Sequence, residues 1–113
     1  MNVGDIHWVE LPPRDGHAQA GRRPAIIVQS DARASSLPTV LLIPLTTQMD
    51  ALRFPGTVLI ETDALNNLRR ASVALVFQLT AVDRRFIVQQ LGEVAQATLQ
   101  QIWIAFDELT DRI

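Results

Sequence analysis

A polar loop bounded by two glycines leads directly into an apolar strand in the first quarter of the chain. The stretch reads GHAQAGRRPAIIV and runs from Gly16 to Val28. Arg23 stands at the mouth of the strand, and Gln19 and His17 lie in the loop before it. A guanidinium group grips a phosphate through paired N–H donors, and loops held by rigid strands often carry binding sites. These residues therefore indicate a candidate site.

The common signatures of hydrolytic enzymes are missing from the sequence. There is no cysteine, and His7 and His17 lack the spacing of a metal-binding pair on a helix. Neither a nucleophile elbow nor a phosphate-binding loop is present, and we expect no metal ion and no cofactor. Cleavage of RNA is one reaction left open, because the 2′-hydroxyl of the substrate is the nucleophile. The protein then orients the phosphate, stabilises its charge and assists proton transfer, which arginine, hydroxyl and amide groups can do.

The basic residues are unusual in kind rather than in number. All ten are arginine, whereas the net charge of −2 gives no overall reason to bind nucleic acid. Two explanations stay open. A GC-rich genome favours arginine codons over lysine codons, which needs no function. Alternatively, the adjacent pairs at 22–23, 69–70 and 84–85 form a local basic surface that the net charge hides.

Hydrophobic periodicity predicts a sheet followed by one helix, in a single domain that spans residues 1–113. With 48% hydrophobic residues, the chain can bury a core. Strands are expected at 5–11, 24–29, 39–45 and 54–60, and a long, bent strand at 71–83 is expected to form a hairpin with 86–90. Pro44 implies an edge or a bulge in the third strand. From residue 93 the period becomes helical. The predicted fold is α+β, a small, strongly curved antiparallel barrel with a C-terminal α-helix.

The large aromatic residues have two interpretations. Trp8 and Phe54 could be platforms on which bases stack, but burial in the core is the expectation. Trp103 lies on the apolar stripe of the helix and is expected in the core or at a dimer contact.

The first ten residues lack the basic start and apolar run of a signal peptide. No apolar run reaches the roughly 20 residues that cross a bilayer. We therefore expect a soluble, cytoplasmic protein that does not bind a membrane.

Four short motifs occur in order along the chain: GDIHWV at 4–9, GHAQAGRRP at 16–24, PLTT at 44–47 and SVALVFQ at 72–78. In this order and spacing they resemble the MazF/PemK family of toxins from toxin–antitoxin systems. The resemblance implies a small SH3-like barrel that works as a homodimer. It also implies a sequence-specific, metal-independent endoribonuclease, which cleaves single-stranded RNA to 2′,3′-cyclic phosphate and 5′-hydroxyl ends. The expected partner is a cognate antitoxin that places a disordered acidic tail in the RNA groove.

The same resemblance assigns catalytic roles. Arg23 is expected to donate to the scissile phosphate and is the candidate acid, while Arg22 is expected to point to the other side of the strand as a surface residue. Thr46 is expected to bond a phosphate oxygen, with Thr47 as a second candidate. The structural alternative for Thr46 is a hydroxyl that closes the end of a strand.

Three further residues are expected to bind RNA. Gln19 and Gln78 carry amides that suit base edges or phosphate, and the alternatives are loop self-bonding and a surface position beside a strand. His17 is expected to stack on a base or bond RNA, and the alternative is a plain exposed histidine.

The chain departs from the family pattern at three positions of the expected RNA face. Ala18 stands where many members have glutamate, Phe77 where an acid is frequent, and Thr80 where a basic residue is frequent. A missing general base would lower the rate. Two other interpretations therefore stay open, a degenerate relative that only binds RNA or its antitoxin, and a poison of DNA gyrase like CcdB, which shares this barrel.

Overall fold

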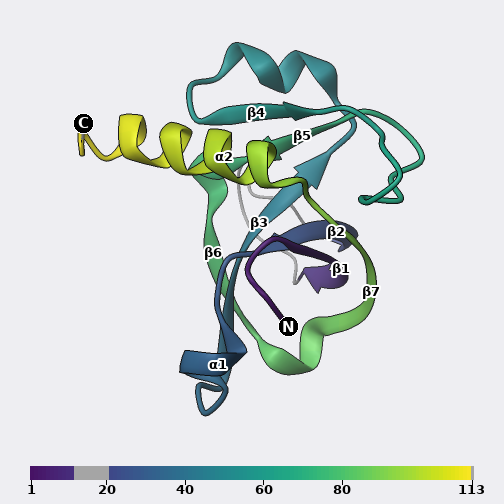
Figure 1. Ribbon diagram of the computed structural model, residues 1–113, viewed down its shortest axis with the longest axis vertical. Helices are drawn as coiled ribbons and strands as arrows, with labels where there is room; N and C mark the ends of the chain where they lie inside the picture. The colour runs from purple at the N-terminus through teal and green to yellow at the C-terminus, as the bar shows by residue number, and fades with distance from the viewer. Residues whose placement is uncertain (12–20, 113) are drawn as a thin grey trace.

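Seven antiparallel β-strands and a C-terminal α-helix dominate the part of the chain that the computed structural model describes, residues 1–11 and 21–112 (Figure 1). The strands are β1 (Asp5–Leu11), β2 (Gly21–Ile27), β3 (Thr39–Thr46), β4 (Thr57–Ile60), β5 (Ser72–Leu75), β6 (Thr80–Asp83) and β7 (Ile87–Glu93). The helices are α1 (Asp31–Ala34) and α2 (Gln96–Leu109), and three 3₁₀ turns are η1 (Met49–Arg53), η2 (Val76–Gln78) and η3 (Arg84–Phe86). The predicted α+β class with a terminal helix is confirmed.

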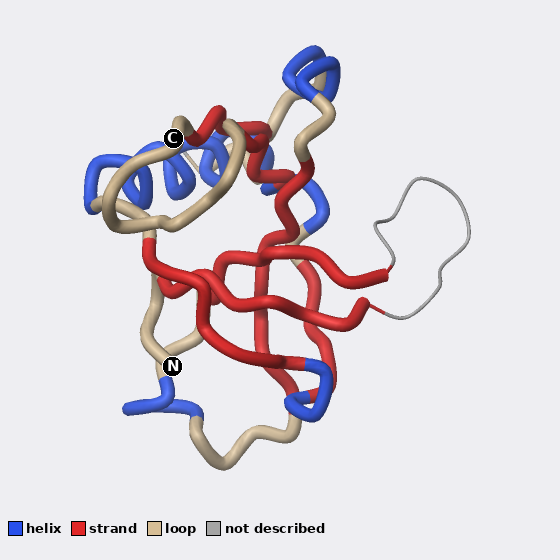
Figure 2. The backbone as a smooth tube through the Cα atoms, turned by 90° about the vertical axis from the view of Figure 1, so that its right-hand side faces the viewer, coloured by secondary structure: helices blue, strands red, loops and turns tan. Residues whose placement is uncertain are grey.

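Strand β3 holds the sheet together, because it pairs with three other strands. The order of the sheet is β4-β5-β3-β2-β1-β7, and β6 pairs with β3 beside this path. Figure 2 shows that the sheet is strongly curved. The two outermost strands, β4 and β7, are not paired with each other, so the described sheet is barrel-like but open.

The curved sheet buries apolar side chains on both faces, because successive residues of a strand point to opposite sides. One cluster lies between the sheet and α2 and includes Ile6, Ile26, Ile43, Leu45, Val58, Ile60, Ala74, Leu99 and Ile102. The other lies on the opposite face of β1, β2 and β3 and consists of Val9, Leu11, Ala25, Ile27, Val40, Leu42 and Val82. Strand β2 contributes to both clusters, which explains its uninterrupted apolar run.

Helix α2 covers the first cluster with a narrower stripe than the sequence predicts. Leu99 and Ile102 are buried, and the side chain of Leu109 lies against Gly56. In contrast, Trp103, which belongs to the predicted stripe, is 36% exposed. The expectation that Trp103 belongs to the core is therefore wrong, whereas its role at a dimer contact stays a prediction.

The prediction of one long strand at 71–83 is wrong. Strand β5 ends at Leu75, the turn η2 redirects the chain, and β6 begins at Thr80. The predicted hairpin is also wrong, since β6 pairs with β3 whereas β7 pairs with β1. Periodicity missed the turn because 71–83 contains neither glycine nor proline to mark it.

The residue type of Pro44 predicts an edge or a bulge, but the structure places it neither at an edge of the sheet nor at a register shift against β2. It lies inside the central strand β3, opposite Ala25 of β2. On the other side of β3, pairing with β6 ends at Leu42 and pairing with β5 begins at Leu45. Pro44 therefore falls in the gap between two partners, where a missing N–H removes no bond from either ladder.

Two aromatic residues lie closer to the surface than expected. Phe54 is 43% exposed and precedes β4, which begins only at Thr57 because Gly56 turns the chain with a φ of +71°. Trp8 is half-buried rather than buried.

None of the helices in the described residues has the length and apolar character needed to cross a membrane.

Candidate functional site

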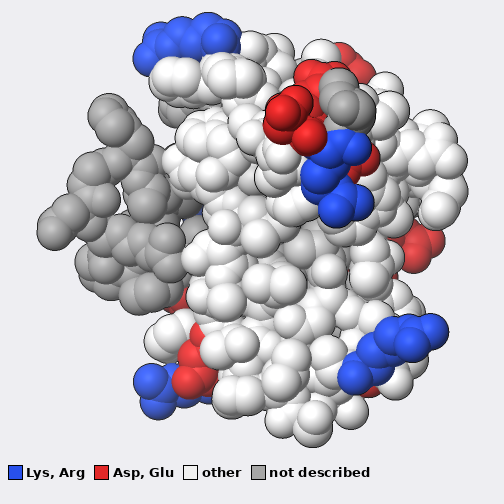
Figure 3. Space-filling view, turned by 90° about the vertical axis from the view of Figure 1, so that its left-hand side faces the viewer, with Lys and Arg blue, Asp and Glu red and all other residues white. Residues whose placement is uncertain are grey.

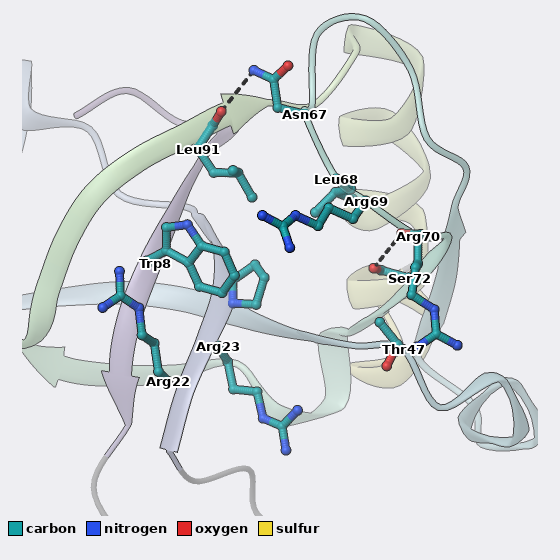
Figure 4. Close-up of a pocket in the computed structure, with 11 residues that line it drawn as sticks. Trp8, Arg22, Arg23, Thr47, Asn67, Leu68, Arg69, Arg70, Ser72 and Leu91 are labelled. Atoms are coloured by element: carbon teal, nitrogen blue, oxygen red, sulfur yellow. Dashed lines mark hydrogen bonds between the residues drawn. The ribbon is translucent and has the colours of Figure 1, made fainter.

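A cavity of about 430 Å³ lies beside the paired ends of β1 and β2, and we call it the arginine cavity (Figure 4). Strand β2 begins at Gly21, earlier than predicted, so Arg22 and Arg23 are strand residues paired with Glu10 and Val9 of β1. Their guanidinium groups diverge, as alternation along a strand requires (Figure 4). Both nevertheless line the cavity.

Two more arginines reach the arginine cavity from the segment between β4 and β5. Arg69 extends into the cavity toward Trp8, and Arg70 extends toward Thr47 (Figure 4). The other residues that line the cavity are Pro24, Asn67, Leu68, Ser72 and Leu91. The pairs 22–23 and 69–70, which are distant in sequence, thus form the local basic surface that the arginine pattern suggested.

The four arginines of this cavity have no ion-pair partner within the part of the chain that the structure describes. Among residues 1–11 and 21–112, no carboxylate lies within ion-pair distance of any of them, and none lines the cavity. All four side chains are exposed. Elsewhere, on the face in Figure 3, charged side chains of both signs form small groups on a largely uncharged surface. Four positive charges around one hollow favour a ligand with several negative charges, such as a phosphodiester chain.

Trp8 forms an aromatic wall of the cavity. The guanidinium carbon of Arg22 lies 5.4 Å from the centre of the Trp8 ring, within the range of a cation–π contact. Trp8 is paired with Pro24 across the β1–β2 ladder, and both line the cavity. The contact holds Arg22 without neutralising it, so its charge stays available to a ligand.

In the third arginine pair, Arg84 has a structural role instead. Arg84 donates through Nη1 to Asp31 at 3.2 Å, and through Nε and Nη2 to the carbonyls of Leu37 and Ala34 at 2.7 and 3.0 Å. Asp31 also accepts a bond of 2.7 Å from the N-terminal ammonium of Met1. That bond, together with Arg84 and against a partial desolvation, holds the pKa of Asp31 below its ordinary value.

Side-chain hydrogen bonds fix the segment that presents Arg69 and Arg70. Asn66 is fully buried. Its Oδ1 accepts from the backbone N–H groups of Leu68 and Asp63 at 3.0 and 3.3 Å, and its Nδ2 donates to the carbonyl of Glu61 at 2.9 Å. The segment therefore has a defined shape although it contains no helix or strand.

Strand β7 supports this segment from the other side. Asn67, which has a φ of +54°, donates through Nδ2 to the carbonyl of Leu91 at 2.9 Å. The N–H of Glu93 donates to the carbonyl of Leu65 at 3.1 Å. Gly92 lies so close that an added Cβ would be 2.5 Å from that same carbonyl oxygen. The close approach of two backbones thus requires glycine here.

A second hollow of about 330 Å³ lies around η1 and η2, and we call it the aromatic hollow. Thr46, Gln48, Asp50, Ala51, Arg53, Phe54, Leu75, Phe77 and Gln78 line it. The rings of Phe54 and Phe77 are 5.6 Å apart and tilted by 59°, and Arg53 lies over Phe54 at 4.8 Å. Phe77, which replaces a frequent acid, is thus part of an exposed aromatic pair.

The structure divides the described residues that were expected at the site, catalytic or RNA-binding, between the two hollows. Arg23 and Thr47 line the arginine cavity, whereas Thr46 and Gln78 line the aromatic hollow. Thr46 is 5% exposed, and its Oγ1 accepts the N–H of Gln48 at 3.2 Å, which is the strand-closing bond considered as its structural alternative. Thr80 lies in β6.

The remaining expected residues, His17 and Gln19, and the departure at Ala18, lie outside the described residues. Arg69, Arg70 and Trp8 belong to the arginine cavity but were not expected at a site. Adjacent arginines were the only signal for the first two, and nothing in the sequence indicated that their loop would face β2. In the described residues, no group of three His, Asp or Glu side chains could hold a metal ion.

Comparison with known proteins gives a match over almost the entire chain. The model of a family described as PemK-like, MazF-like toxins of type II toxin–antitoxin systems matches residues 2–110. Endoribonuclease MazF of Staphylococcus saprophyticus is 28% identical over 107 residues, which cover 95% of this chain and 88% of the relative.

Solved structures share the fold. MazF from Deinococcus radiodurans superposes with a TM-score of 0.81 at 24% sequence identity, covering 98% of this chain and 96% of that one. An endoribonuclease in complex with its cognate antitoxin, from a mycobacterial species, superposes with a TM-score of 0.76 at 21% identity, covering 98% and 95%. The arrangement of strands around α2 is therefore one that other chains of similar length adopt.

Proposed function

The chain belongs to the family of PemK-like, MazF-like toxins of type II toxin–antitoxin systems, and on this premise we propose that it is an endoribonuclease that cuts single-stranded RNA at specific sequences. The observation that carries the proposal is the arginine cavity, where four guanidinium groups without an ion-pair partner among the described residues surround one hollow. Its relative in Staphylococcus saprophyticus is an endoribonuclease by name. RNA supplies both the phosphates that such a cavity attracts and the nucleophile that the protein lacks.

In the proposed reaction, the 2′-oxygen of one nucleotide attacks the adjacent phosphorus, and the bond from phosphorus to the 5′-oxygen breaks. The 2′-hydroxyl gives up its proton to water and the 5′-oxygen takes up a proton, which leaves a 2′,3′-cyclic phosphate and a 5′-hydroxyl. Arg23 stabilises the charge that develops on the phosphate and is the candidate donor of the proton. Thr46 lines the aromatic hollow rather than the arginine cavity, so we propose that it approaches the same phosphate from the other side. Its Oγ1 accepts the N–H of Gln48 and keeps its own proton, which it would donate to a phosphate oxygen.

Secondary roles follow for the other expected residues. We place Thr47 beside Arg23 as a second hydroxyl on the phosphate, because both line the arginine cavity. Gln78 and the loop residues Gln19 and His17 are proposed to contact bases. The aromatic hollow suits this role, since stacking on Phe54 and Phe77 would hold a base beside the Gln78 amide.

The proposed assembly is a homodimer neutralised by a cognate antitoxin whose disordered, acidic tail competes with RNA. A solved relative is described in complex with its cognate antitoxin, and an acidic tail would be attracted to the uncompensated arginines. We place the protein in the cytoplasm, where messenger RNA is translated.

The test is incubation of the purified protein with a long single-stranded RNA in EDTA, followed by mapping of 5′-hydroxyl ends. We expect cuts at a short repeated sequence. Arg23→Ala should lower the rate by about 10²–10³-fold, the usual effect of removing one donor to a developing oxyanion. Arg33→Ala is the matched control, because Arg33 is an exposed arginine on α1 and does not line the cavity.

Each other outcome of this test would change a different part of the proposal. Equal cleavage by Arg23→Ala and the wild type would contradict the assignment of Arg23. Cleavage only by Ala18→Glu would mean that the site is intact and lacks its general base. If neither the wild type nor any variant cleaves RNA, the ribonuclease proposal is contradicted. That result would favour a protein that only binds its antitoxin or that poisons a DNA topoisomerase.

A further inference from the structure

We propose that Arg69 and Arg70 form a second phosphate-binding subsite, which holds a phosphate of the RNA strand that is not cut. The inference rests on the proposed function and goes beyond it, because it assigns binding to a segment that no expected site residue occupies. The segment is the connection between β4 and β5, residues 61–71. Its two arginines would fix the register of the strand, while Arg23 acts at the scissile phosphate.

The first argument is electrostatic. Arg69 and Arg70 are adjacent, exposed, and without a carboxylate within ion-pair distance among the described residues. Of the other described arginines, Arg53, Arg84, Arg85 and Arg112 each pair with an aspartate, whereas the single exposed Arg33 of α1 has no such partner among the described residues. Two like charges side by side cost free energy unless an anion compensates them. No described carboxylate compensates this adjacent pair, which leaves both charges open to an anionic ligand.

The second argument is rigidity. The buried Asn66, the bond from Asn67 to the carbonyl of Leu91 and the bond from the Ser72 hydroxyl to the carbonyl of Arg70 at 3.1 Å all constrain the backbone around the two arginines. A pair of arginines held on a fixed backbone loses less entropy when it binds a planar or tetrahedral anion. Such preorganisation is typical of a binding segment rather than of a solvated charge pair.

The third argument is continuity with the proposed active site. Arg70 extends toward Thr47, which lines the same cavity as Arg23, and Arg69 extends toward Trp8 (Figure 4). A strand with one phosphate at Arg23 therefore carries its neighbouring nucleotide into the hollow between Arg69 and Trp8. That hollow offers guanidinium groups for a phosphate and an aromatic face for a base. An acidic peptide would match the charge but has no phosphate spacing to satisfy, so RNA is the occupant we infer.

The binding test uses an RNA that contains the mapped cut sequence, with a 2′-deoxy nucleotide in place of the attacking one. Its affinity is measured over a series of salt concentrations for the wild type, Arg69→Ala, Arg70→Ala and the double variant. The slope of log K against log salt should fall by about 0.7 for each phosphate of single-stranded RNA that the variant no longer neutralises. Arg33→Ala is again the control and should keep the wild-type slope.

A methylphosphonate scan locates the subsite along the strand. Each non-bridging charge outside the scissile position is removed in turn, and cleavage by the wild type and the double variant is compared. For the wild type, one position should raise KM roughly tenfold, as expected for the removal of hydrogen bonds between charged groups. In the double variant KM is already raised, and the same methylphosphonate should have no further effect.

The outcomes separate this inference from the proposed function. If the wild type cleaves RNA but the double variant keeps the wild-type salt slope and the full methylphosphonate penalty, the second subsite is wrong and the ribonuclease stands. The second subsite is also wrong if the double variant binds RNA as tightly as the wild type does but binds a polyglutamate peptide less tightly in the same affinity measurement. If the wild type does not cleave, the proposed function fails first. Thermal unfolding of each variant checks that the arginine substitutions leave the fold intact.

Discussion

Asn66 is the residue on which the shape of the 61–71 segment depends. Its side chain satisfies two backbone N–H groups and one carbonyl, and it is fully buried. Asn66→Ala would leave these groups without partners in a place that water does not reach. We expect it to lower the free energy of unfolding by about 3 kcal/mol. Leu65→Ala, in the same segment but 50% exposed, should change it by less than about 0.5 kcal/mol. Urea denaturation of both variants measures the difference.

At the residue scale, the sequence predicted the side chains that motifs mark and missed those that only the fold brings together. Arg23 and Thr47 were expected, and they line one cavity. Trp8 was expected in the core because aromatic residues in strands are usually buried, but its ring faces a hollow between two sequence-distant segments. No local pattern encodes such an encounter. The roles of Arg23, Thr46, Thr47 and Gln78 stay predictions.

At the scale of elements, β7 approaches the 61–71 segment closely because residue 92 is a glycine. An added methyl group at Gly92 would meet the backbone of Leu65 and Asn66 at 2.5–2.7 Å. We therefore expect Gly92→Ala to destabilise the protein by about 1–3 kcal/mol, the usual cost of overpacking. Because the displaced segment carries Arg69 and Arg70, the same variant should also weaken RNA binding. Gln89→Ala, at an exposed position of β7, is the control. Unchanged stability would mean that the two backbones can separate without cost.

Elements with a clear hydrophobic periodicity could be predicted from the sequence. Boundaries that arise where β3 changes from one neighbouring strand to another could not. The limits of β1 agree with the sequence, because Pro12 follows it and its apolar pattern is regular. The break between β5 and β6 was missed because both pieces are apolar. They separate only because β3 pairs with β6 up to Leu42 and with β5 from Leu45. Long-range pairing, not local preference, sets that boundary.

At the scale of the whole molecule, Asp31 connects the N-terminus, α1 and η3 through Met1 and Arg84. Its lowered pKa means that the unfolded chain takes up a proton before the folded one does. The stabilisation is therefore complete above the ordinary value of 3.8 and is lost as the pH falls from there through the lowered folded value. Asp31→Asn should destabilise the protein at neutral pH, and its difference from the wild type should vanish in acid. Urea denaturation over a pH series measures this.

Asp50→Asn is the control for that experiment. Asp50 pairs with Arg53 at 3.5 Å, but both side chains are about two-thirds exposed or more, at 71% and 67%. Exposed pairs of this kind contribute little, so its unfolding should follow the wild type at every pH. A constant difference between Asp31→Asn and the wild type down to strong acid would contradict the linkage.

The split between Thr46 and Thr47 limits how this protein can change over evolution. The two residues are neighbours, yet one lines the aromatic hollow and the other the arginine cavity, because side chains alternate at the end of a strand. Gaining or losing a single residue between Pro44 and Thr46 would shift both hydroxyls by one position and turn each toward the opposite side. Descendants of this chain must therefore inherit the length of the tract unchanged, and not only its two threonines.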